Sequence, residues 1–169
     1  SSTGSFNLMA FTGDSIGKEK IAGDFDHANE LGSPYYYQVM LKNSGINAAF
    51  TATERTALCK FTFSQSTTGH FVLSDVTNTT VIDSSTISGR CQGYYFIMKF
   101  SKVFDFVNPY SGADEKPVAS GGNTFPSAII IHYAAKENET ILVKIGFSTT
   151  SFNGVKNNIQ TEQSGWDFE

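Results

Sequence analysis

The feature that most constrains the fold is an alternation of side-chain types between Pro34 and Phe63. Three runs within this stretch repeat with a period of two, at residues 35–42, 46–53 and 56–63. A period of two puts alternate side chains on opposite faces of a β-strand, whereas a helix repeats every three to four residues. The runs are joined by Asn43-Ser44-Gly45, which tolerates the backbone angles of a tight turn, and by Glu54-Arg55. The stretch therefore predicts a three-stranded antiparallel meander with one apolar face that other parts of the chain must bury.

The rest of the chain supplies further strands that can cover this face. Apolar or alternating runs bounded by turn residues occur at residues 6–12, 71–76, 81–90, 94–104, 128–133 and 141–147. Ser84-Ser85 suggests a bend within the third run, and the charged neighbours of Asn138 predict a hairpin between the last two. Strands of this number with short connections indicate an all-β fold, either a two-layer antiparallel β-sandwich or a barrel.

The end of the chain breaks the strand pattern. Phe152, Val155 and Ile159 are spaced as one stripe of a helix between residues 151 and 163. Ser151 is a suitable N-cap, and Gly165 would lie at or just past the C-terminal end of this helix. We therefore predict one C-terminal helix, with residues 151–169 forming the helix and the start of a linker.

Composition limits the partners of the chain. Its 169 residues suit one domain with a sizeable core, and 15 phenylalanines favour strands. A net charge of −4 argues against nucleic acid as a partner, and no run approaches the length of apolar sequence that spans a membrane. The opening Ser1-Ser2-Thr3-Gly4 suggests that residues 1–169 are one domain cut from a larger chain. Cys59 and Cys91 are too few for a disulfide scaffold, which predicts two buried thiols.

Short motifs spread over nearly the whole chain carry a family resemblance. They are Asp26-His27-Ala28-Asn29-Glu30, Ser33-Pro34-Tyr35-Tyr36-Tyr37, Gly45-Ile46, Thr51-Ala52-Thr53-Glu54-Arg55, Tyr94-Tyr95-Phe96, Phe100-Ser101-Lys102, residues 141–148, Asn158-Ile159 with Glu162, and Gly165-Trp166-Asp167-Phe168. In this order they resemble the N-terminal domain of the family 92 glycoside hydrolases, the calcium-dependent exo-α-mannosidases. Collinear matches of this extent are far more specific than any single motif.

The resemblance implies a sandwich rather than a barrel, and it implies a partner domain. In the family, the sandwich packs on a larger helical barrel that carries the catalytic acids, and that barrel would begin beyond Glu169. The parent enzyme would hydrolyse α-mannosides in glycans such as N-glycans, require calcium, and work in the periplasm, on the cell surface or after secretion. Two departures from the family pattern indicate a divergent member: Ala57-Leu58-Cys59-Lys60 replaces a Gly-Phe-His-Arg run, and Phe25-Asp26 replaces Phe-Ser.

His27 and Glu30 are the candidate pair for chemistry, because His and a carboxylate suit both metal binding and acid–base catalysis. No third ligand follows at a suitable spacing, so we favour a local hydrogen-bonded pair that positions the first meander strand. His70 and His132 lie beside or within strands without a recognisable partner, which is typical of core or edge histidines. We predict no catalytic, cofactor-binding or metal-binding residue in this fragment, and we expect the fragment by itself to be inactive.

The aromatic residues offer two further roles. Tyrosines in the clusters 35–37 and 94–95 could stack on sugar rings, although alternation turns about half of each cluster into the core. Trp166, Asp167 and Phe168 lie past the helix, and the resemblance implies that they contact the following domain. Two classes of function therefore remain: a non-catalytic domain of a mannosidase, or a stand-alone carbohydrate-binding or interaction sandwich without catalysis.

Overall fold

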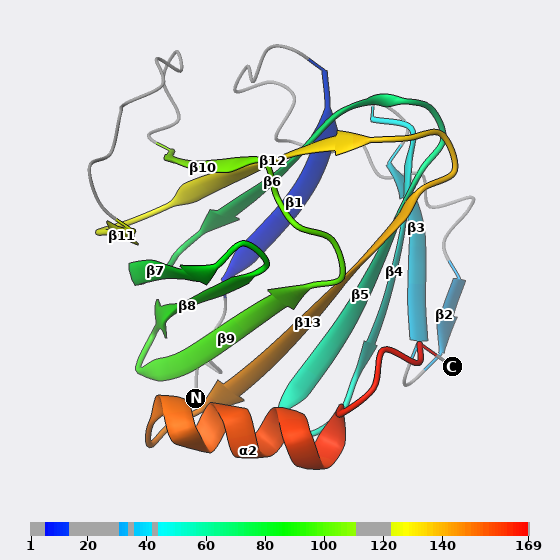
Figure 1. Cartoon of the computed structure of the whole chain (residues 1–169). Helices are drawn as coiled ribbons and strands as arrows, with labels where there is room; N and C mark the ends of the chain where they lie inside the picture. The colour runs from blue at the N-terminus through cyan, green and yellow to red at the C-terminus, as the bar shows by residue number, and fades with distance from the viewer. Residues whose placement is uncertain (1–5, 14–30, 34–35, 42–43, 111–122, 169) are drawn as a thin grey trace.

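The structure is a computed structural model that describes residues 6–13, 31–33, 36–41, 44–110 and 123–168. Two antiparallel sheets pack face to face, and a single helix in the described residues lies across one end (Figure 1). The four-stranded sheet has the order β1 (Asn7–Thr12), β6 (Thr67–Ser74), β12 (Ile129–Ala135) and β10 (Phe106–Pro109). The nine-stranded sheet has the order β11 (Thr124–Phe125), β7 (Thr77–Asp83), β8 (Thr86–Cys91), β9 (Tyr94–Phe100), β13 (Thr140–Ser148), β5 (Thr56–Phe63), β4 (Ile46–Ala52), β3 (Tyr36–Leu41) and β2 (Leu31–Ser33). The predicted β-sandwich with one C-terminal helix is confirmed.

The predicted meander forms three of the nine strands of the larger sheet. Strands β3, β4 and β5 are consecutive neighbours in antiparallel register. Gly45 has φ 61°, a left-handed backbone conformation that glycine adopts without steric cost, in the turn between β3 and β4. Val39, Ala48 and Phe61 are buried on the apolar face of the meander. This face packs on the smaller sheet, as the alternation predicted.

Aromatic rings from both sheets fill the space between them. The ring of Phe71 on β6 lies 4.9 Å from that of Phe61 and 5.3 Å from that of Tyr133, measured between centroids. Phe100 on β9 contacts Phe71 and Tyr133 from the larger sheet. Cys59 and Cys91 are buried free thiols, as predicted. The core is therefore made from side chains that are far apart in sequence.

The hairpin predicted for the last two strands is wrong. Strand β12 pairs with β6 and β10 in the smaller sheet, whereas β13 pairs with β5 and β9 in the larger one. The chain crosses between the sheets near Asn138, whose N–H donates to the carbonyl of Phe63 on β5. A short connection between two strands fits either a hairpin or a crossing of this kind. Which of the two forms depends on β5 and β6, the earlier strands with which β13 and β12 pair.

Three strand boundaries also differ from the prediction. The strand expected at residues 94–104 ends at Phe100, and past its end the Lys102 ammonium donates to the Glu139 carboxylate and the carbonyl of Ala134. The weak run at residues 81–90 belongs to a hairpin of β7 and β8, whose turn is closed by Asp83 accepting from the N–H of Ser85. The run expected to begin at residue 71 starts at Thr67.

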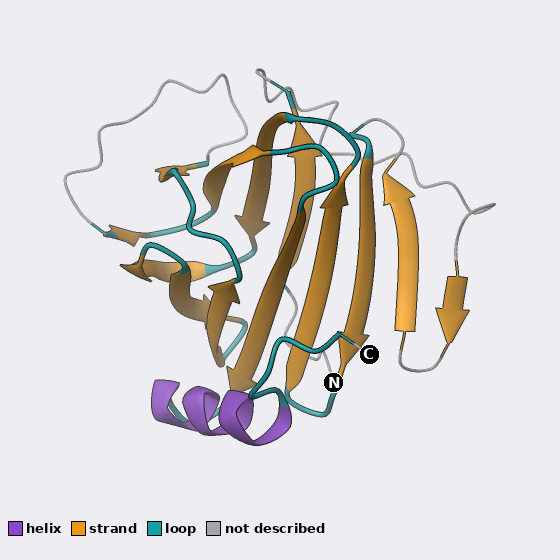
Figure 2. Cartoon of the chain, turned by 45° about the vertical axis from the view of Figure 1, so that its right-hand side comes forward, coloured by secondary structure: helices purple, strands orange, loops and turns teal. Residues whose placement is uncertain are grey.

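Helix α2 (Phe152–Glu162) lies against the outer face of the larger sheet (Figure 2). Its N-cap is Ser151, whose hydroxyl accepts from the N–H of Gly154 as predicted. Val155 and Ile159 are buried against Ile97 of β9. The C-cap is Gln163, so Gly165 lies just past the end of the helix.

Candidate functional site

Glu162 in the last turn of α2 binds the turn between β4 and β5. Thr53 Oγ1 donates to Glu162 Oε2 at 2.6 Å, and the backbone N–H of Arg55 donates to the same oxygen at 2.9 Å. Arg55 Nε donates to Glu162 Oε1 at 2.5 Å. These donors, the Thr53 hydroxyl first, hold the pKa of Glu162 below its usual range. We call Thr53, Arg55 and Glu162 the helix latch.

The helix latch joins motifs from distant parts of the sequence that carry the family resemblance. Asn158 supports it, because its side-chain amide donates to the carbonyl of Phe147 at 2.7 Å. The N–H of Phe147 in turn donates to the carbonyl of Arg55. The carboxylate of Glu162 accepts from three donors and is held in its charged form, so it is suited to anchoring α2 rather than to proton transfer.

A groove of about 500 Å³ lies beside the helix latch, between α2 and the strand ends. Arg55, Tyr94, Asn157 and Asn158 line it, together with Glu54, its one carboxylate among the described lining residues. Inverting glycosidases need two carboxyl groups with a water between them. The described part of this groove therefore does not support that mechanism.

The tail after α2 crosses the outer face of the larger sheet. The Lys144 ammonium lies 4.5 Å from the centre of the Trp166 ring and donates to the carbonyl of Ser164. Phe168 contacts the edge of Tyr36, and the ammonium of Lys60 lies 5.6 Å from its ring. Trp166 remains 37% exposed, and Asp167 is exposed. The tail residues thus lie outside the core, and their contact with a following domain stays a prediction.

The other predicted site residues are only partly covered by the structure. His27 and Glu30 lie outside the described residues, so their role as a structural or chemical pair stays a prediction. Among the tyrosines, Tyr36 is at the surface, whereas Tyr37 and Tyr94 pack against the core. Tyr95 lies on the outer face beside α2.

The structure brings together His70 and His132, which the sequence interpretation treated separately. They are paired across β6 and β12, with their Nδ1 atoms 2.8 Å apart, and both are buried. His70 Nε2 donates to the carbonyl of Gly13, so His70 Nδ1 is left to accept from His132 Nδ1. Burial, followed by the neighbouring His70, lowers the pKa of His132 to about 4. The pair is a buried contact on the outer face of the smaller sheet, where Phe11 and Phe106 stack on the two rings. No sequence pattern links residues on strands this far apart.

The resemblance implies calcium for the parent enzyme, which raises the question of ligands among the described residues. Among them, no three His, Cys, Asp or Glu side chains lie close enough to hold one metal ion. Calcium takes six to eight oxygen ligands, several of them carboxylates. No helix in the described part of the chain is long and apolar enough to cross a membrane.

Fold and site together define a class of protein: a two-layer β-sandwich whose outer face is covered by an anchored helix and an aromatic tail. The model of the family described as "Glycosyl hydrolase family 92 N-terminal domain" matches residues 1–148. The chain therefore belongs to this family, and the resemblance inferred from the motifs is confirmed. None of the curated proteins compared with the chain matches it in sequence.

Solved structures of larger enzymes have the same fold. The family GH92 α-mannosidase BT3965 from Bacteroides thetaiotaomicron superposes with a TM-score of 0.77 at 22% identity, over 96% of this chain and 26% of its own. The family GH92 inverting mannosidase BT2199 from the same organism superposes with a TM-score of 0.77 at 19% identity, over 96% of this chain and 24% of its own. The family GH92 glycosyl hydrolase ccman5 superposes with a TM-score of 0.73 at 17% identity, over 96% of this chain and 26% of its own. The chain thus spans about a quarter of the length of these relatives.

Proposed function

We propose that the chain is a non-catalytic domain of an α-mannosidase, which supports hydrolysis of α-mannosides in glycans by a helical-barrel domain that follows it. The observation that carries the proposal is the family match over residues 1–148, combined with solved GH92 enzymes about four times as long. The groove beside the helix latch supports a non-catalytic role, since Glu54 is the one carboxylate among its described lining residues.

Two further parts of the proposal follow from family membership. The whole enzyme requires calcium for activity, with the ligands outside the described residues of this chain. It also acts outside the cytoplasm, in the periplasm, on the cell surface or after secretion, where glycans are its substrates.

The direct test is an assay of mannose release from an α-mannoside, with the purified chain of 169 residues and with the full reading frame in parallel. We expect no release by the shorter chain and calcium-dependent release by the longer one. A preparation from a strain expressing an unrelated protein controls for contaminating mannosidase. Release by the 169-residue chain above that control would overturn the non-catalytic assignment.

The interdomain role of the tail can be tested separately through Trp166, the single tryptophan of the chain. Because Trp166 is 37% exposed, acrylamide should quench its fluorescence in a dilute monomer. A matched measurement on Trp166→Phe gives the background. A Trp166 signal that is fully shielded in the monomer would mean that the domain closes on itself, which would favour a stand-alone interaction module.

A further inference from the structure

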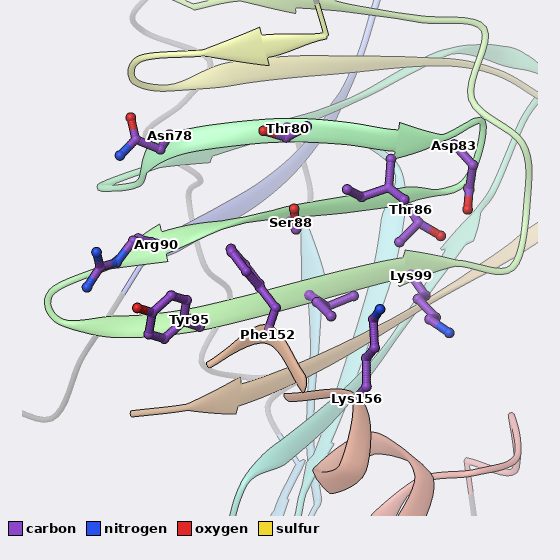
Figure 3. A pocket seen from close by; sticks show the side chains of 12 residues that line it. Asn78, Thr80, Asp83, Thr86, Ser88, Arg90, Tyr95, Lys99, Phe152 and Lys156 are labelled. Carbon is purple, nitrogen blue, oxygen red and sulfur yellow. The ribbon is translucent and has the colours of Figure 1, made fainter. Parts of the chain in front are cut away.

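A second groove, of about 770 Å³, lies on the other flank of α2, over the outer face of strands β7, β8 and β9 (Figure 3). We call it the β7–β9 groove. Its lining includes Arg90 of β8, Tyr95 and Lys99 of β9, and Phe152 and Lys156 of α2. Figure 3 shows Phe152 near its middle, with Tyr95 and Arg90 toward one end and Lys99 and Lys156 toward the other. The groove belongs neither to the helix latch nor to the tail.

The middle of the β7–β9 groove is apolar and accessible. The rings of Tyr95 and Phe152 meet edge to face, with centroids 5.0 Å apart. Phe152 is 37% exposed, and Ile82 on the opposite wall is 59% exposed. The hydroxyls of Thr80 and Ser88 line the same wall. Exposed aromatic rings with a few polar groups beside them are typical of small-ligand sites.

The charge of the β7–β9 groove is opposite to that of the chain. Three cations line it, Arg90, Lys99 and Lys156, against one carboxylate, Asp83, in a chain with a net charge of −4. Asp83 is already bound by the N–H and hydroxyl of Ser85. Strands β5, β8, β9 and β13 contain no Asp or Glu, so their outward lysines and arginine have no acidic neighbour on the same strands. Burial and the nearby Lys99 both lower the pKa of Lys144, as expected for a face with excess positive charge.

We propose that the β7–β9 groove binds an anionic saccharide. Its pyranose ring packs on Phe152 beside Tyr95, and its carboxylate or phosphate group is bound by Arg90. The Arg90 guanidinium lies over the Tyr95 ring, 4.5 Å from its centre, so the ring holds the planar fork in place at this end of the groove. A guanidinium pairs with a carboxylate or phosphate through two parallel hydrogen bonds, which gives it both affinity and orientation.

Alternative occupants fit the groove less well. A neutral sugar would leave the three cations without a counter-charge, and an apolar peptide would bury them at a cost in desolvation. A nucleic acid requires a continuous basic face, which a chain of this net charge does not favour. The proposal goes beyond the mannosidase assignment and holds whether or not the chain is part of an enzyme.

The test is a titration of the ¹⁵N-labelled 169-residue chain, followed by amide chemical shifts, with four probes: mannose 6-phosphate, glucuronic acid, mannose and inorganic phosphate. We expect the anionic sugars to shift the amides of Arg90, Tyr95 and Phe152, with affinities about tenfold above those of mannose or phosphate, which corresponds to about 1.4 kcal/mol. Binding of mannose 6-phosphate or of glucuronic acid alone would support the proposal and identify the anionic group.

Three variants separate binding from folding. Tyr95→Ala and Arg90→Gln should each weaken binding of the anionic sugars about tenfold, while their spectra stay dispersed. Lys136→Gln removes one exposed charge outside the groove and should bind like the parent chain. Equal affinity for mannose and mannose 6-phosphate would overturn the proposal, and so would inorganic phosphate that binds as tightly as mannose 6-phosphate. It is also overturned if no amide signals shift, if the amides that shift lie outside the groove, or if the shifts follow self-association of the protein.

Discussion

The two faces of strands β9 and β13 are built from the same alternating pattern but differ in what covers them. On the inner face, residues such as Met98 and Val143 are fully buried by the opposite sheet. On the outer face, Ile97 lies under α2, whereas Lys99 lines an open groove. Inward positions in the middle of these strands are thus covered by the partner sheet, whereas the cover of an outward position depends on where one helix and one tail lie.

This difference should appear in energetics. The inner face is closed by many large apolar contacts, which stabilise the fold in proportion to the area they bury. Helix α2 covers the outer face mainly with Val155 and Ile159, and it is positioned by the helix latch. The inner face should therefore control global stability, and the outer face should control local docking and binding.

The largest difference in the free energy of unfolding should appear when a phenylalanine is replaced by alanine on the inner face and, in a second variant, on the outer side. Phe71→Ala leaves a cavity beside Phe61 and Tyr133 and should lower the free energy of unfolding by about 3–5 kcal/mol. Phe152→Ala, on the half-exposed outer face, is the matched control and should cost less than about 1 kcal/mol. Urea unfolding of both variants measures the difference. Equal losses would mean that the outer face contributes to global stability as much as the core does.

The buried histidine pair on the smaller sheet gives a pH-dependent effect of the next size. Because the pKa of His132 is lowered from 6.5 to about 4, the unfolded chain binds a proton in this range that the folded chain does not. Its contribution to stability is complete above pH 6.5 and is lost as the pH falls toward about 4. At roughly 1.4 kcal/mol per pKa unit, the loss is of the order of 3 kcal/mol.

The pH effect is checked by urea unfolding across this window and by NMR titration of the His132 ring in the folded chain. The two measurements must agree, because carboxylates also titrate at the acid end of the window. A His132 pKa near the ordinary value of 6.5 would show that the ring is not buried against His70 as the structure describes.

A change that disturbs only the outer face tests local docking. A Cβ added at Gly146 would lie 2.4 Å from Ile159 Cγ1, so Gly146→Ala should push α2 away and cost about 1–3 kcal/mol. Ile159→Ala removes the two closest atoms, so Gly146→Ala should cost less in that background. Hydrogen exchange of the α2 amides measures the docking. Faster exchange confined to α2 is the expected result, and uniform acceleration through the core strands would contradict it.

The smallest effect should come from the helix latch. Glu162→Gln removes the charge that accepts from Thr53 and Arg55 and should cost about 1 kcal/mol, since the ion pair is near the surface. Because the pKa of Glu162 is lowered, its stabilisation is present at neutral pH and is lost as the pH falls through the acid range. Thermal unfolding at neutral and acid pH should show the difference between parent and variant shrinking in acid. Lys136→Gln serves as a control for the loss of one surface charge.

The sequence by itself determined the local elements. The meander of β3, β4 and β5, the turn at Gly45, and the Ser151 cap of α2 all depend on residues within a few positions of one another. Alternation, turn chemistry and capping are short-range properties, so a single sequence is enough to predict them. The family resemblance was visible for the same reason, because its motifs are short and collinear.

Only the tertiary structure decided which sheet β13 joins, that His70 meets His132, and that Glu162 binds the turn at Arg55. Each of these contacts joins residues dozens of positions apart, and alternation says which face a side chain takes but not which strand lies beside it. The β7–β9 groove has the same origin: Arg90, Lys99 and Lys156 are unremarkable in sequence. They become a cluster because β8, β9 and α2 are neighbours in space. The interaction between two charges depends on the distance between them and not on their separation in sequence.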